Sequence, residues 1–218
     1  MSVPPTAYLI LGDSNFHYSD EGRFLWLFGR STQSAVDYLR PLLSESGTVV
    51  ALGWHNLQAH FYDNMALSAV LELLEAGGNK THVVICVGQN DVLRFLNRGG
   101  PIPVGNSRMK KMQAAKLKGR LLSAVNNLER HLSKLRRLVT VQVCLPFDAP
   151  DASTLDENYL FMVEVLREVW MEKTRANKWG TITFQPDAKW WLPDKMHLSR
   201  SGRVAFAATV AAAVRASP

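Results

Sequence analysis

The chain has 218 residues, a formal net charge of +6, 47% hydrophobic and 20% charged residues. This is ordinary globular composition, and the length suits one compact domain, so we expect a single domain over residues 1–218. No apolar run approaches the roughly 20 residues of a membrane helix, and the first residues lack the pattern of a secretory signal. Two cysteines, Cys86 and Cys144, indicate neither a disulfide framework nor a metal site. Their place in apolar runs favours a reducing, cytoplasmic compartment.

Five short apolar segments predict the strands of a sheet: residues 7–11, 48–52, 81–87, 139–145 and 181–184. None of them alternates between apolar and polar residues, as the strands of a half-exposed sheet would. Near-continuous apolar runs are typical of parallel strands that are covered on both faces.

Helical patterns separate these segments, over residues 31–43, 64–75, 109–138, 156–177 and 199–216. Pro41 interrupts the first near its end, Gly77-Gly78 ends the second, and Ser199 is the expected N-cap of the last. In the third, one apolar stripe contains Leu117, Leu121, Val125, Leu128, Leu132 and Leu135. Residues 97–108, rich in Gly and Pro, are expected to form a surface loop.

The alternation of strands and helices predicts an α/β domain with a mostly parallel five-stranded sheet between helices. Right-handed crossovers leave few topologies, of which we expect the flavodoxin-like three-layer sandwich with strand order 2-1-3-4-5. In open sheets of this kind, ligands bind outside the carboxyl ends of the strands. Residues that carry chemistry should therefore follow the apolar segments.

Four polar blocks stand at such positions: Gly12-Asp13-Ser14, Gly53-Trp54-His55-Asn56, Gly88-Gln89-Asn90-Asp91 and, before the last helix, Asp194-Lys195-Met196-His197-Leu198-Ser199. Acyl transfer needs a nucleophile, a base, a group that orients the base, and donors for the oxyanion. Ser14 is the candidate nucleophile, His197 the base, and Asp194 its orienting acid. The candidate oxyanion donors are the Asn90 amide and the backbone N–H groups of Gly53 and Ser14.

Ser14, His197 and Asn90 each also have an interpretation without a catalytic role. Ser14 could be a turn residue, His197 a residue at a helix entry, and Asn90 an Asx-turn residue with Asp91 as the helix cap. Around the site, Trp54, His55, Trp190 and Trp191 are candidates for lining a substrate pocket. At least one of the two adjacent tryptophans is expected in the core.

The blocks occur in the order GDS, a Gly after the second strand, G-x-N-D and D-x-x-H-L. This order resembles that of the SGNH, or GDSL-type, hydrolase family. The similarity spans Leu9 to Gly202, and the residues that name the family correspond to Ser14, Gly53, Asn90 and His197. It implies a flavodoxin-like fold, no metal or organic cofactor, and ester hydrolysis through an acyl-enzyme intermediate, with Asp194 as third triad member. The block GWHN lacks the small residues that are frequent there, and Asn15 stands where many relatives have Leu.

Residues 108–137 are strongly basic, with Glu129 as the single acid opposing Arg108, Lys110, Lys111, Lys116, Lys118, Arg120, Arg130, Lys134, Arg136 and Arg137. They form either a solvated face or a docking surface for nucleic acid or an anionic membrane. The absence of aromatic residues in this stretch argues against base stacking. SGNH-like domains also occur in proteins of some non-LTR retrotransposons, and one without the catalytic residues binds RNA in an insect germ-plasm organiser.

We therefore predict a serine ester hydrolase that acts on an acetyl or a lipid acyl ester. The alternative is an SGNH-like module that binds nucleic acid or an anionic membrane, with weak or no catalysis.

Overall fold

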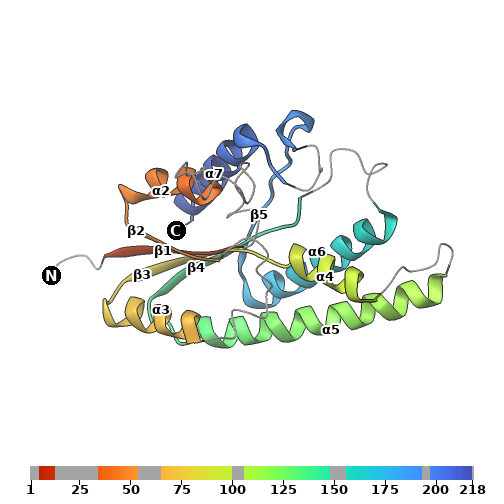
Figure 1. Ribbon diagram of the computed structural model, residues 1–218. Coiled ribbons are helices and arrows are strands. Elements are labelled where there is room, and N and C mark those ends of the chain that lie inside the picture. Colours follow the sequence, from red (N-terminus) through yellow and green to blue (C-terminus); the bar gives the residue numbers. More distant parts are fainter. Residues whose placement is uncertain are drawn as a thin grey trace, which may run out of the picture.

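Five parallel strands form one sheet in the order β2-β1-β3-β4-β5 in the computed structural model of the chain, which confirms the predicted topology (Figure 1). The strands are β1 (Thr6–Gly12), β2 (Thr48–Gly53), β3 (Lys80–Cys86), β4 (Leu138–Cys144) and β5 (Gly180–Ile182). The structure describes residues 5–12, 34–53, 65–99, 106–147, 156–192 and 197–217.

Helices connect the strands and cover both faces of the sheet: α2 (Ala35–Ser44), α3 (Met65–Ala76), α4 (Gln89–Gly99), α5 (Ser107–Leu132), α6 (Glu157–Asn177) and α7 (Arg200–Arg215). A short 3-10 helix, η4 (Ala188–Trp190), lies between β5 and α7. Figure 1 shows α2 and α7 on one side of the sheet and α3, α4, α5 and α6 on the other.

The side chains of each strand divide between two cores, one on each face of the sheet. In β1, Leu9 and Leu11 belong to the core under α3, α5 and α6, whereas Tyr8 and Ile10 belong to the core under α2 and α7. Because alternate residues are buried on opposite faces, every position of the strand interior is apolar. This is why the segments show no alternation in the sequence.

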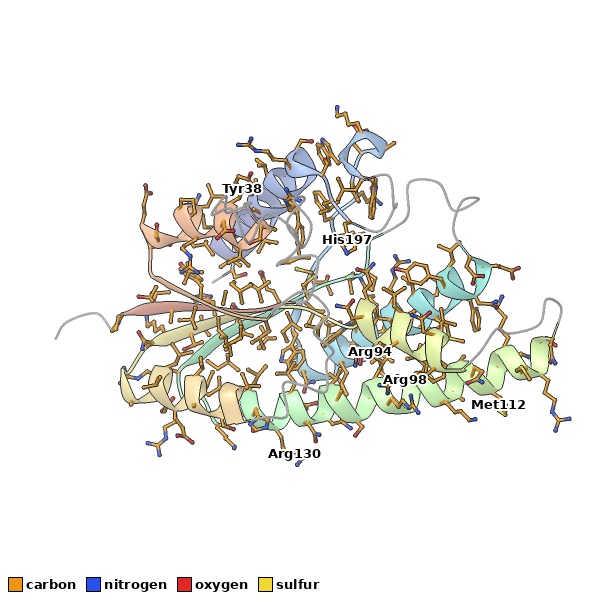
Figure 2. The ribbon with its side chains drawn as sticks, in the orientation of Figure 1. Tyr38, Arg94, Arg98, Met112, Arg130 and His197 are labelled. Carbon is orange, nitrogen blue, oxygen red and sulfur yellow. The ribbon has the colours of Figure 1, made fainter. Side chains whose placement is uncertain are left out.

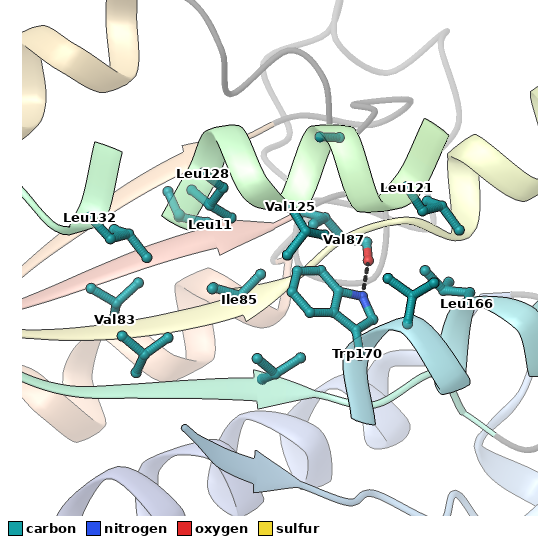
Figure 3. Close-up of a cluster of buried hydrophobic side chains, with 14 of the residues drawn as sticks. Leu11, Val83, Ile85, Val87, Leu121, Val125, Leu128, Leu132, Leu166 and Trp170 are labelled. Atoms are coloured by element: carbon teal, nitrogen blue, oxygen red, sulfur yellow. Dashed lines mark hydrogen bonds between the residues drawn. The ribbon is translucent and has the colours of Figure 1, made fainter. Parts of the chain in front are cut away.

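The apolar stripe of α5 packs against the sheet beside α6 (Figure 3). The largest side chain in this core is Trp170 of α6, which is 1% exposed. Its indole Nε1 donates a hydrogen bond to the carbonyl oxygen of Val87 at 3.1 Å. The bond satisfies the one polar group of the buried ring and ties α6 to the residue that follows β3.

Some predicted details were wrong. Pro41 does not interrupt α2, which continues through it to Ser44. Strand β5 ends at Ile182 rather than at Phe184. Helix α5 ends at Leu132 rather than 138, because Ser133 and the turn after it take over its last carbonyl groups. Residues 97–99, expected in a loop, belong to α4, a helix that the sequence did not reveal. The other predicted elements are confirmed, including the Ser199 cap, whose Oγ accepts from the Gly202 N–H. Within the described residues no helix is long and apolar enough to cross a membrane.

A histidine on β3 makes the stability of the fold depend on pH. The ring of His82 is partly buried, its Nδ1 lies 2.9 Å from Thr140 Oγ1, and Lys80 is on the same strand. Burial, and to a lesser extent the charge of Lys80, lower the pKa of His82 below its ordinary value of 6.5.

We predict that the free energy of unfolding decreases as the pH falls below about 6.5, since the unfolded chain then takes up a proton that the folded His82 resists. Urea unfolding at pH 7.5 and pH 5.5 measures the decrease. In His82→Asn the decrease should be smaller than in the wild type. An identical decrease in both proteins would show that His82 does not contribute.

Candidate active site

The carboxyl ends of β1, β2 and β3 lie side by side at one edge of the sheet. Gly12, the last residue of β1, is in register with Gly53 of β2 on one side and with Cys86 of β3 on the other. The chain continues from Gly12 to Asp13 and Ser14, which lie outside the described residues. The predicted polar blocks of the first three strands therefore start from neighbouring positions.

The turn from β3 into α4 requires a glycine at position 88. Gly88 has φ +116°, and a Cβ on it would lie 2.5 Å from Cδ1 of Leu166. The N–H of Val92 donates to the Gly88 carbonyl at 3.2 Å, so helical bonding begins directly after the strand. Asn90 is in the first turn of α4 and only 7% exposed. Because the helix starts at Gln89, Asp91 is inside the first turn, and the alternative of a cap at Asp91 is wrong.

The backbone at His197 is paired with the residues that follow η4. The backbone N–H of Leu192 donates to the His197 carbonyl at 2.8 Å, and Trp191 and Leu198 form an antiparallel bridge. Residues 193–196, which include the predicted acid Asp194, lie outside the described residues. Figure 2 shows the half-buried His197 between α7 and the carboxyl edge of the sheet.

Arg203 supports the backbone next to His197, a role that was not predicted from the sequence. Its side chain is 2% exposed, and its Nη1 donates to the carbonyl of Leu198 at 3.0 Å, next to His197. A signal was present in the sequence: Arg203 occupies an apolar-stripe position of α7, three and four residues before the buried Phe206 and Ala207. A cation at such a position indicates a specific buried hydrogen bond.

The two adjacent tryptophans differ in their surroundings. Trp191 is 8% exposed and belongs to the core, with its ring edge-on to Phe147 at 6.2 Å. Trp190 is half-buried and stacks on Phe184 at 5.8 Å. The expectation that at least one of them is in the core is confirmed. The other pocket candidates, Trp54 and His55, lie outside the described residues, and their role stays a prediction.

The cations of residues 108–137 do not form one unpaired basic surface in the structure. Lys110, Lys118 and Arg136 form ion pairs with acids of other elements, Glu157, Glu172 and Glu75, at 2.7, 3.1 and 3.7 Å. Glu129, the single acid of the stretch, pairs with Lys173 of α6 at 3.0 Å. The cations after Leu132 are not on α5 at all. Of the remaining cations, Arg120 lies where α5 faces α4.

One hollow of about 340 Å³ lies between α4 and α5, and another of about 410 Å³ lies between α3 and the turn after α5. Neither is lined by Gly53, Asn90 or His197. Among the described residues, no three His, Cys, Asp or Glu side chains are grouped as metal ligands would be.

The packing of Gly202 gives a test of how α7 is held against Trp190 beside His197. A Cβ on Gly202 would lie 2.5 Å from the Trp190 carbonyl oxygen, which belongs to the backbone and must shift. We expect Gly202→Ala to lower the free energy of unfolding by about 1–3 kcal/mol. Urea denaturation provides the measurement.

Gly119→Ala is the matched control, because nothing lies within 4 Å of the added Cβ on α5. It should raise the free energy of unfolding by about 0.5–1 kcal/mol. If both variants were equally stable, the packing of α7 against Trp190 would not depend on the close contact at Gly202.

No protein-family model matches the sequence, and no curated protein matches it. Several solved structures resemble this fold. A GDSL-like lipase from Parabacteroides merdae has a TM-score of 0.65 at 17% identity, covering 97% of this chain and 96% of its own. An acetylxylan esterase from Geobacillus stearothermophilus has a TM-score of 0.62 at 19% identity, covering 96% and 94%. A lipase from a goat rumen metagenome has a TM-score of 0.66 at 16% identity, covering 95% and 97%. The chain therefore has the fold of the SGNH, or GDSL-type, hydrolases.

Proposed function

We propose that this chain is a serine ester hydrolase that acts through an acyl-enzyme intermediate. The observation that supports it most is the alignment of Gly12 with Gly53 and Cys86 at one sheet edge. The chain reaches Ser14 two residues after Gly12 and Asn90 four residues after Cys86. The likeness of the fold to esterases and lipases agrees with this assignment.

In the proposed reaction, Ser14 Oγ attacks the acyl carbonyl carbon while His197 takes the hydroxyl proton, and Asp194 orients the imidazole. The tetrahedral intermediate collapses when His197 gives this proton to the leaving alcohol. Water then attacks the acyl-enzyme with His197 again as base, which releases the carboxylic acid and restores Ser14.

The oxyanion is stabilised by the backbone N–H groups of Ser14 and Gly53 and by the Asn90 side-chain amide. Asn90 is nearly buried, so its amide is held in place and acts where water is largely excluded. It also belongs to the first turn of α4, whose partial positive charge favours a developing anion.

The substrate class we propose is an acetyl or a lipid acyl ester. Among the similar structures are an acetylxylan esterase and lipases. An acetylxylan esterase variant described as a catalytic mutant, with a serine replaced by alanine, also shares the fold at 20% identity and a TM-score of 0.59. It supports a serine nucleophile on this scaffold.

Hydrolysis of p-nitrophenyl acetate and butyrate by the wild type and by Ser14→Ala tests the proposal. Turnover and fluorophosphonate labelling should both be lost in Ser14→Ala. A folded wild type that neither turns over these esters nor reacts with fluorophosphonate would contradict the proposal and favour a binding module.

Asn90→Ala should reduce kcat for p-nitrophenyl acetate by about 10²–10³-fold, because one oxyanion donor is lost. Fluorophosphonate labelling of Ser14 should still be detectable. Asn97→Ala is the control, since Asn97 is an exposed asparagine on the same helix, and its kcat should equal that of the wild type. An unchanged kcat in Asn90→Ala would remove Asn90 from the oxyanion hole.

A further inference from the structure

A groove of about 340 Å³ lies between α4 and α5. Figure 2 shows Arg94 and Arg98 of α4 beside α5. The groove has an apolar floor and a polar, basic rim. Among the described residues its lining consists of Asp91, Arg94, Phe95, Arg98, Leu117, Arg120, Ser123, Ala124 and Asn127.

Helical spacing brings the polar groups of the rim onto the two facing sides. Arg94 and Arg98 are four residues apart on α4 and are both exposed. On α5, Arg120, Ser123 and Asn127 follow one another at intervals of three and four residues. Residues at such intervals lie on one side of a helix, so each helix presents a continuous polar row to the groove.

One of the three guanidinium groups is held in position by an aromatic ring. The guanidinium carbon of Arg120 lies 5.3 Å from the ring centroid of Phe95, which is 7% exposed and forms part of the floor. A cation that stacks on a ring in this way loses less conformational freedom when it binds a ligand.

The charges of Arg98 and Arg120 are not neutralised as those elsewhere on α5 are. On the side of α5 that faces α6, Lys110 and Lys118 pair with Glu157 and Glu172. Within the described chain, no acid lies within ion-pair distance of Arg98 or Arg120. The one acid of the rim, Asp91, is seven residues before Arg98, about 10 Å along the helix axis. The half of the groove near Arg98 and Arg120 is therefore strongly positive.

We propose that this groove binds the phosphate group of a small phosphorylated compound. Guanidinium groups match phosphate oxygens with paired N–H donors, and the two of Arg98 and Arg120 together suit a group that carries two negative charges better than a single carboxylate. The volume is within the range of pockets for small molecules. The apolar floor of Phe95, Leu117 and Ala124 accommodates the organic part of the ligand. The site is separate from the candidate ester site and does not require its chemistry.

Calorimetric titration of the full chain with inorganic pyrophosphate at low salt tests the proposal. Saturable binding is expected. Arg98→Gln and Arg120→Gln should each weaken it by about 10-fold or more, because each removes a charged hydrogen-bond donor. Arg120→Lys should recover only part of the loss. Lys111→Gln is the control, since it removes one positive charge from an exposed position of the same helix outside the groove, and it should change the affinity less than 2-fold.

The source of the phosphate is distinguished by a second titration with a single-stranded oligothymidylate. Weaker binding of the oligonucleotide than of pyrophosphate supports a small ligand. Tighter binding of the oligonucleotide would overturn the proposal in favour of nucleic acid. Equal losses in Arg120→Gln and Lys111→Gln would overturn it as well, because the affinity would then follow total charge rather than the groove. If pyrophosphate did not bind at all, the proposal would also be overturned.

Discussion

The parallel register of β1 with its two neighbours is the constraint on which the candidate site depends. Gly12 faces Gly53 and Cys86 across the two ladders, so three strands stop at the same level. A shift of two residues in either ladder would move its polar block by about 7 Å along the strand. The register is fixed in turn by the two cores, since a one-residue shift would exchange the side chains of the two faces. Packing in the sheet therefore determines where the chemistry can be.

Burial on both faces also explains why polar residues gather at the edge. The interior positions of β1 are filled by side chains of the two cores and leave no room for a polar side chain. The first polar positions are in the turns, where Gly88 allows the chain to leave β3 and start α4 at once. The first turn of a helix also leaves backbone N–H groups free, so polar groups are expected at this place.

The sequence was sufficient to predict the sheet, its strand order and most helices, because periodicity records which faces are buried. It was insufficient for α4. The block Gly88-Gln89-Asn90-Asp91, where this helix starts, has the residue types of a turn, and the helix has only a few apolar positions. It also overextended α5: Leu135 continues the spacing of the stripe and is buried, but it lies in the turn after the helix.

For the candidate site, local patterns identified which strand ends carry polar residues. They could not show partners that are distant in the chain. The pairing of Lys118 with Glu172, for example, depends on how α5 lies against α6. A buried structural role for Arg203 could have been inferred from a cation in an apolar stripe. Its hydrogen bond to Leu198 depends on tertiary structure.

The position of a strand in the sheet also affects how often it opens. In the described chain β2 pairs with β1 alone, and β5 pairs with β4 over three residues. Strands with one neighbour exchange their amide hydrogens through local unfolding that costs less free energy than opening the centre of a sheet. Gly53 is on such an outer strand, whereas Asn90 follows the central β3. The two candidate oxyanion donors therefore belong to regions of different local stability. We expect local unfolding to displace Gly53 more often than Asn90.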